Sequence, residues 1–248
     1  MAGRPEPPPS TPDKYPTNFL LDDIVTLEIG RKSKTIQVHR GVLSFYSGVI
    51  KLSTEKFDVV ELAVTWMYVR KLDVDFEGKY FFDTGLLLCE LWTFADRRQI
   101  PLLANVAIDH LRSHHLMHWY APSLEMIRYS YANTPANAAL RRFMVFFLTV
   151  NGSSHIFKKI GGDFEWPQEA IWDLLIAVSG DRNDGAYQHK HYPVTVDTKV
   201  KHQKKIIQDV NMCKYHIHDS GVSCKITGQK RSRSDPEELP AGKASKKK

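Results

Sequence analysis

The amino-acid sequence predicts an α+β protein: a small sheet near the N-terminus, stacked helices after it, an all-helical extension and disordered tails. Two periodicities carry this prediction. Residues 22–30 and 35–38 alternate apolar and polar side chains, which is the period of half-buried strands. From about residue 42 to residue 180 the apolar residues recur at intervals of three and four, which is typical of amphipathic helices.

The alternating pattern predicts a hairpin. Val25, Leu27 and Ile29 share one face of a first strand that ends at Gly30, and residues 35–38 alternate again after a polar turn. The period then changes from two to 3.6, so a helix is expected to follow the hairpin. Its apolar positions are Val42, Leu43, Tyr46 and Val49, and residues 50–53 could add a short third strand after it.

Helical spacing predicts two further helices over 58–70 and 84–98, and one that begins at Pro101 and ends near His114. Strands and helices of one domain bury their apolar faces against each other. The residues expected inside this core are Val25, Leu27, Val38, Leu43, Val60, Trp66, Leu91 and Val106.

Three more helices are expected in the extension. The first spans about 123–132, and the second uses Thr134 as N-cap and Pro135 as its first residue and ends at 151–152. The third runs from Trp166 to Gly180. Its expected inward residues are Ile171, Leu174, Leu175 and Val178.

The net charge of +6 is concentrated near the C-terminus. From Lys199 onward, thirteen Lys and Arg face five Asp and Glu, a balance of +8, so the preceding residues sum to −2. Beyond Asp181 the sequence is polar and shows no clear period. The expected organisation is a disordered Pro-rich leader (1–18), a small α+β domain (19–118), a helical extension (119–180), a polar segment with a Cys/His cluster (181–228) and a disordered basic tail (229–248).

Several function classes are disfavoured. No run of eighteen apolar residues could cross a bilayer, and the N-terminus lacks the apolar core of a secretory signal. Three cysteines (Cys89, Cys213 and Cys224) are too few for a disulfide framework. We therefore expect a nuclear or cytoplasmic protein, neither secreted nor membrane-bound. No phosphate-binding glycine loop, His-Glu-x-x-His or Gly-x-Ser-x-Gly motif occurs, so a non-enzymatic protein is expected.

Three blocks of sequence, in this order, match a known family. The first joins residues 23–30 and 36–44, the second is Val59-Val60-Glu61-Leu62 with Trp66-Met67-Tyr68, and the third lies in residues 88–102 with Ile100-Pro101-Leu102. Over roughly residues 20–116 the chain resembles a BTB/POZ domain, and its style is most similar to the BTB proteins of filamentous fungi. The segment after the first helix is shortened near 48–50, where the family has a second helix.

The resemblance implies a protein–protein interaction module that self-associates, or an adaptor for a cullin-type ubiquitin ligase or a transcriptional complex. It also implies that Asp23 and Arg40 form a charged pocket at a dimer groove; the alternative is an exposed ion pair worth under about 1 kcal/mol. The family's dimer surface would map here to Val42, Phe45, Tyr46 and Val49, which cannot all point inward. The shortened segment leaves dimerisation open and adds the alternative of a degenerate, non-functional paralogue.

A cluster near the C-terminus contains the ligand types of a zinc site. Two thiols and two imidazoles lie within twelve residues, the number needed for one tetrahedral zinc ion. The alternative is a chance cluster in a polar segment or an ordinary hairpin. The candidate ligands are Cys213, His216, His218 and Cys224.

Two other groups have ordinary explanations. His110, His114 and His118 are spaced by four, but no further ligand is evident, so a solvated helix face is expected. Cys89 lies among leucines and is expected in the core.

The basic tail resembles a bipartite nuclear-import signal. Its residues also support a competing function, a nuclear protein that binds nucleic acid through the tail and the Cys/His segment. They are Lys230, Arg231, Arg233, Lys243, Lys246, Lys247 and Lys248.

Overall fold

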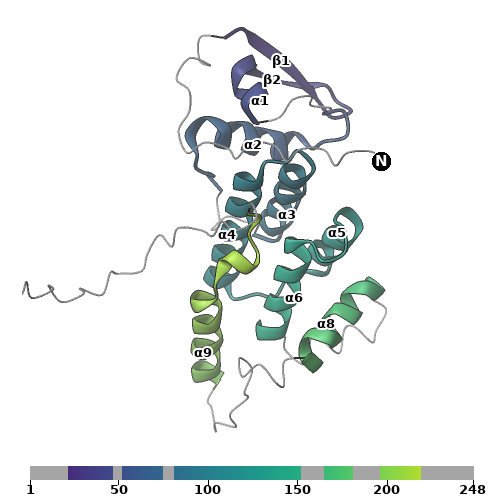
Figure 1. The fold of residues 1–248 in the computed structure, drawn as a ribbon, viewed down its shortest axis with the longest axis vertical. Helices are drawn as coiled ribbons and strands as arrows, with labels where there is room; N and C mark the ends of the chain where they lie inside the picture. Colours follow the sequence, from purple (N-terminus) through teal and green to yellow (C-terminus); the bar gives the residue numbers. More distant parts are fainter. Residues whose placement is uncertain (1–21, 47–51, 75–80, 152–164, 181–195, 219–248) are drawn as a thin grey trace, which may run out of the picture.

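A computed structural model describes residues 22–46, 52–74, 81–151, 165–180 and 196–218. The predicted leader and basic tail lie outside these residues. The predicted α+β class is confirmed: one antiparallel hairpin precedes a mostly helical chain (Figure 1). The elements are β1 (Ile24–Ile29), β2 (Lys34–His39), α1 (Arg40–Tyr46), α2 (Phe57–Val69), α3 (Phe81–Arg97), α4 (Pro101–His118), α5 (Leu124–Asn133), α6 (Ala139–Asn151), α8 (Gln168–Gly180), α9 (Val196–Asp209) and the 3-10 helix η2 (Met212–Lys214).

The hairpin closes through a tight turn after β1. The pairing runs from Ile24 opposite His39 to Ile29 opposite Lys34. Gly30 has a φ of 66°, and a Cβ at this position would lie 3.1 Å from the Glu55 carbonyl oxygen, so glycine suits the turn.

The proposed third strand is not present among the described residues of its range. Leu52 is buried, and its carbonyl oxygen accepts one hydrogen bond from the Gly30 N–H at 3.2 Å, but it belongs to no strand. Residues 50 and 51 lie outside the described ranges. A single backbone contact beside β1 therefore replaces a paired strand.

The predicted core forms as expected. Val38, Val60, Trp66 and Leu91 are buried, and Trp66 keeps only 2% of its surface exposed. The remaining four expected residues are partly buried and pack against the same core: Val25, Leu27, Leu43 and Val106. Burial of this apolar surface is the main favourable contribution to folding.

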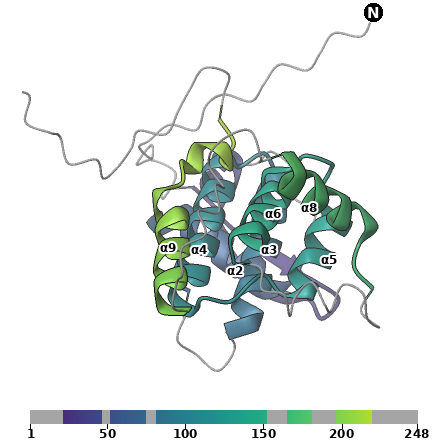
Figure 2. The same cartoon turned by 90° about the horizontal axis from the view of Figure 1, so that it is seen from below.

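The elements stack in order along the molecule. In Figure 1 the hairpin and α1 lie at one end, α2 separates them from the α3–α4 pair, and α5 and α6 follow. Figure 2, seen from below, places α8 and α9 on opposite sides, with α6 and α4 between them. In the described part of the chain, no helix is both long and apolar enough for a membrane span.

Two helix boundaries differ from the sequence prediction. Helix α4 continues one turn past His114 and ends at His118, where Trp119 adopts a left-handed φ of 56° and its N–H donates to the His115 carbonyl oxygen. Helix α6 begins at Ala139 and not at Pro135, because Thr134, the predicted N-cap, closes α5: both its N–H and its hydroxyl donate to the Ser130 carbonyl oxygen.

The polar segment beyond Asp181 contains an element that the sequence pattern did not predict. Helix α9 packs on α4 and α6, with Ile207 fully buried, and η2 follows with Tyr215 buried beside it. The signal was present but weak, since few apolar residues mark the inner face of a lysine-rich helix. Residues 199–215 therefore belong to the folded body.

Candidate interaction site on helix α8

Helix α8 docks on α5 and α6 through a small apolar contact. Ala170 and Leu174 are buried in a second core cluster with Ile127, Tyr131 and Leu148. Only a narrow strip of α8 is used here, because alanine and a single leucine bury little area. Further contacts must fix the orientation of this helix.

A buried arginine of α6 supplies part of that fixation. Arg141 donates to the Tyr131 carbonyl oxygen at 2.8 Å and to the Thr134 hydroxyl at 3.1 Å, and it pairs with Glu169 of α8. Its guanidinium lies over the Tyr131 ring, 4.5 Å from the ring centroid. Such charge-assisted bonds are stronger than neutral ones, so Arg141 ties α5, α6 and α8 together.

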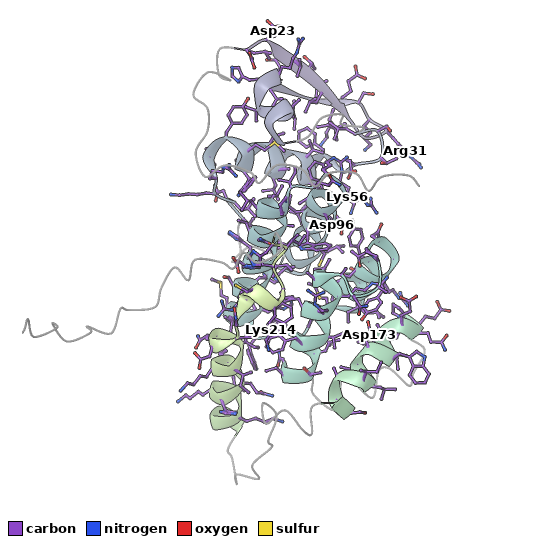
Figure 3. The ribbon with its side chains drawn as sticks, in the orientation of Figure 1. Asp23, Arg31, Lys56, Asp96, Asp173 and Lys214 are labelled. Atoms are coloured by element: carbon purple, nitrogen blue, oxygen red, sulfur yellow. The ribbon has the colours of Figure 1, made fainter. Side chains whose placement is uncertain are left out.

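A tyrosine of α5 makes the second polar link. The Tyr131 hydroxyl donates to Asp173 Oδ2 at 2.7 Å. Burial, and then this hydrogen bond to a carboxylate, raise the pKa of Tyr131, so the phenol keeps its proton and remains a donor. Asp173 is labelled in Figure 3 at the junction of α8 with the rest of the helices. Both acidic side chains of α8 thus serve its inner contacts.

The opposite side of α8 exposes large apolar residues. Leu175 and Val178 were expected inward and the structure corrects this, because Ala170 and Leu174 with the two acidic residues make the inner face. The outward set, with exposed fractions, is Trp172 (57%), Leu175 (50%), Ile176 (66%) and Val178 (56%). We call these four residues the α8 outer face. Single exposed apolar residues are normal, but a cluster of this kind marks an interaction surface.

The histidines of α4 do not form a solvated face. His114 and His115 are each 1% exposed, which corrects the expectation for this cluster. The ring of His114 lies 5.3 Å from that of His118, centroid to centroid. Burial, with the neighbouring His118, lowers the pKa of His114 to about 4.

His115 is the more deeply embedded of the two. Its ring centroid lies 4.4 Å from that of Phe147, and Nδ1 lies 2.9 Å from the Tyr120 carbonyl oxygen, so Nδ1 carries the proton. Burial and the neighbouring His114 lower the pKa of His115 to about 3. Both histidines are therefore neutral core residues, His115 against Phe147 of α6 and His114 beside Gly85 of α3.

The pair proposed for a charged pocket meets at the surface. Arg40 Nη2 lies 3.7 Å from Asp23 Oδ2, but the two side chains are 63% and 79% exposed. Figure 3 shows Asp23 at the outer end of the hairpin. This is the exposed ion pair of the alternative interpretation, and the backbone bond from the Arg40 N–H to the Asp23 carbonyl oxygen, at 2.8 Å, ties α1 to the hairpin more firmly.

The proposed dimer surface on α1 is only partly described. Val42 is fully buried in the monomer, so it belongs to the core and contributes no exposed surface. The side chains of Phe45 and Tyr46, and the whole of Val49, lie outside the described residues. Their role in self-association stays a prediction.

The proposed zinc ligands are partly described. His216 Nε2 contacts Asp109 Oδ1 of α4 at 3.1 Å, and the rings of His216 and His218 lie 5.8 Å apart. Within the described ranges, no three His, Cys, Asp or Glu side chains gather closely enough to hold a metal, and this includes Cys213. Cys224 lies outside these ranges. The zinc site gains no support from this geometry.

Two remaining predictions have different outcomes. Cys89 is fully buried as expected, and burial raises the pKa of its thiol. The import-like residues, from Lys230 to Lys248, lie outside the described part of the chain.

Comparisons with protein-family models, with curated proteins and with solved structures returned no match. The candidate site therefore depends on geometry alone. Sequence reasoning missed it because α8 is apolar on most sides, and the residues that select its inner face, Tyr131 and Arg141, come from other helices. The available signal was the acidic pair Glu169 and Asp173, one helical turn apart.

Proposed function

We propose that the chain is a non-enzymatic protein-interaction module of BTB type that associates with a second copy of itself through the α8 outer face. The observation that carries the proposal is the orientation of α8. Its carboxylates bind inward to Arg141 and Tyr131, while Trp172 and Ile176 point to water. An apolar face left outside after polar groups have been used for docking favours a protein partner.

A second copy is the favoured partner because the four residues of the α8 outer face carry no charge of their own. Trp172, Leu175 and Ile176 follow the spacing of one helix stripe, Asp173 lies on the inner side, and the 68% exposed Glu169 at the edge of the stripe is paired with Arg141. Two such helices can pack across a two-fold axis without bringing like charges together, and closed dimers are the commonest oligomers.

The BTB assignment is supported by the order of elements and by the core. A hairpin, a short helix and then stacked helices follow each other as the resemblance implies, with Trp66 and Leu91 inside. The sheet described here has two strands only. Adaptor roles toward a ubiquitin ligase or a transcriptional complex, in the nucleus or cytoplasm, remain proposals that depend on this assignment.

Light scattering at micromolar concentrations tests the proposal. The wild-type chain is expected to show a dimer mass, and Ile176→Asp is expected to show a monomer mass. Val69→Asp is the matched control, because Val69 is a lone apolar residue of α2 with a similar exposed fraction of 56%. A wild-type monomer at all concentrations, or equal dissociation in both variants, contradicts association through α8.

A further inference from the structure

Helix α9 is held on α4 and α6 by contacts that fix its orientation. Ile207 is fully buried, and the Arg112 Nε of α4 donates to the Ile207 carbonyl oxygen at 2.9 Å. At the other side, Gln203 Nε2 donates to the Val150 carbonyl oxygen of α6 at 2.6 Å. A side chain of α4 thus holds the α9 backbone, a side chain of α9 holds the α6 backbone, and the opposite face of α9 faces water.

The chain that follows α9 is fixed equally well. The Asn105 amide donates to the Ile217 carbonyl oxygen at 3.0 Å and accepts from the Ile217 N–H at 2.7 Å. The Tyr215 ring packs against Phe143 and Phe146, with centroids 5.6 and 5.4 Å apart. Lys214, labelled in Figure 3, lies in this segment next to the helix. The segment after α9 is therefore held in place on α4 and α6, as the helix itself is.

Four lysines occupy the solvent side of α9 and its margin. Lys199, Lys201 and Lys205 are exposed, and Lys204 is half-buried with its ammonium 5.5 Å from the Trp119 ring centroid. We call these four residues the α9 lysine face. None of them has an ion pair with a carboxylate among the described residues.

The charge of this face is local. In residues 199–218 five lysines face a single acidic residue, Asp209, a balance of +4, whereas the residues before Lys199 sum to −2. Positive charge is thus concentrated on α9 and the segment after it, which carry half of the +8 of residues 199–248. A concentrated positive patch of this kind attracts polyanions.

We propose that the α9 lysine face binds the phosphate backbone of nucleic acid without sequence preference. Lysine ammonium groups neutralise phosphates as point charges, and such contacts carry affinity but no base recognition. Besides the exposed imidazole of His202, no described aromatic side chain lies on the solvent side of α9 for base stacking, since Trp119 and Tyr215 pack beneath or beside the helix.

A membrane surface fits this face less well. A basic helix binds lipid when its apolar side inserts into the headgroup region. In α9 that side is already used, because Ile207 is buried against α4 and α6. Binding by charge alone remains, and nucleic acid offers the higher charge density.

The test measures fluorescence anisotropy of a labelled duplex DNA with the full chain over a salt series. Lys201→Glu/Lys205→Glu is compared with Lys32→Glu/Lys71→Glu, which changes the net charge equally at exposed positions of the hairpin turn and the end of α2. We expect the α9 variant to bind about tenfold or more weakly, with a salt slope lower by about 1.8, from about 0.9 for each lost phosphate contact. The control variant is expected to keep the wild-type slope.

Three results overturn the proposal. The first is an equal loss of affinity in both double variants, which would mean a response to net charge alone. The second is an unchanged salt slope in the α9 variant, which would place the binding elsewhere, for example in residues 229–248. The third is binding to phosphatidylserine vesicles that depends on Lys201 and Lys205 in the absence of DNA binding, which would make the face a lipid contact.

Discussion

Helices α8 and α9 cover opposite sides of the same support, and they do so by opposite means. Helix α8 uses its carboxylates to dock on Arg141 and Tyr131 and turns Trp172 and Ile176 outward. Helix α9 buries Ile207 and turns its lysines outward. Figure 2 shows the two helices apart, with α6 and α4 between them.

The difference indicates two kinds of partner. A lysine face is stable in water and gains from binding only through charge, whereas an apolar face loses free energy in water of about 25 cal/mol for each Å² that stays exposed. The α8 outer face therefore favours a protein partner, and the α9 lysine face favours a polyanion.

Arg141→Met is expected to lower the free energy of unfolding by about 3 kcal/mol, because two buried carbonyl oxygens, of Tyr131 and Thr134, lose a charged donor. Urea denaturation measures the change. Glu169→Gln is the control, since this side chain is 68% exposed and should cost under about 1 kcal/mol. Equal costs would mean that Arg141 does not support the inner face of α8.

The orientation of α8 predicts different losses of stability for Leu174→Ala and Leu175→Ala, two neighbouring substitutions in this helix. Leu174 is 5% exposed and Leu175 is 50% exposed. We expect the first to cost about 2 to 3 kcal/mol, from lost burial and a cavity, and the second to cost under about 0.5 kcal/mol at concentrations where the chain is monomeric. Thermal unfolding measures both losses of stability. Similar losses would contradict an orientation of α8 in which Leu174 points inward and Leu175 outward.

His115→Asn is expected to reduce the pH dependence of stability. An unfolded histidine takes up its proton near pH 6.5 and the buried His115 only near pH 3, so stability is full above pH 6.5 and falls below it. At pH 5 the free energy of unfolding is lower by about 2 kcal/mol because of this residue. Asn keeps the donor at the position of Nδ1 and cannot titrate, so the variant should lose less stability between pH 7 and pH 5. An identical pH profile would mean that His115 is protonated in the folded protein.

Asn105→Ala is expected to lower the free energy of unfolding by about 1 kcal/mol, because it removes two half-buried hydrogen bonds to the Ile217 backbone. In the variant, backbone amides near residues 215–217 should exchange faster with solvent, whereas the α8 amides should exchange at the wild-type rate. Faster exchange throughout α8 would mean that the two sides are not independent.

The N-terminal half was predictable because local pattern and tertiary contacts agree there. The period of two in β1 and the spacing of Val60 and Trp66 each mark one buried face, and the structure buries those faces. The histidines of α4 were misjudged by residue type. His114 and His115 continue the buried stripe of Ile108 and Leu111, so their position indicated burial although their polarity did not.

The two flanking helices were harder to predict for physical reasons. The inner face of α8 is selected by Arg141, which lies twenty-eight residues before Glu169, and no local period reports such a contact. Helix α9 carries so many lysines that its pattern resembles a solvated tail, and only Ile207 and its apolar neighbours mark the inner side. Local patterns locate helices, but distant partners decide which face is buried.

Thiol cross-linking at α8 tests whether two copies of the chain associate through this helix. Ile176→Cys is introduced into a chain that also carries Cys213→Ser and Cys224→Ser, which leaves the buried Cys89 unreactive. Under mild oxidation we predict a covalent dimer from Cys at position 176 and none from a matched Lys71→Cys chain, since Lys71 is exposed just after α2, a helix that lies apart from α8 in Figure 1. Equal cross-linking at both positions, or a dimeric mass without any cross-link at position 176, would contradict association through the α8 outer face.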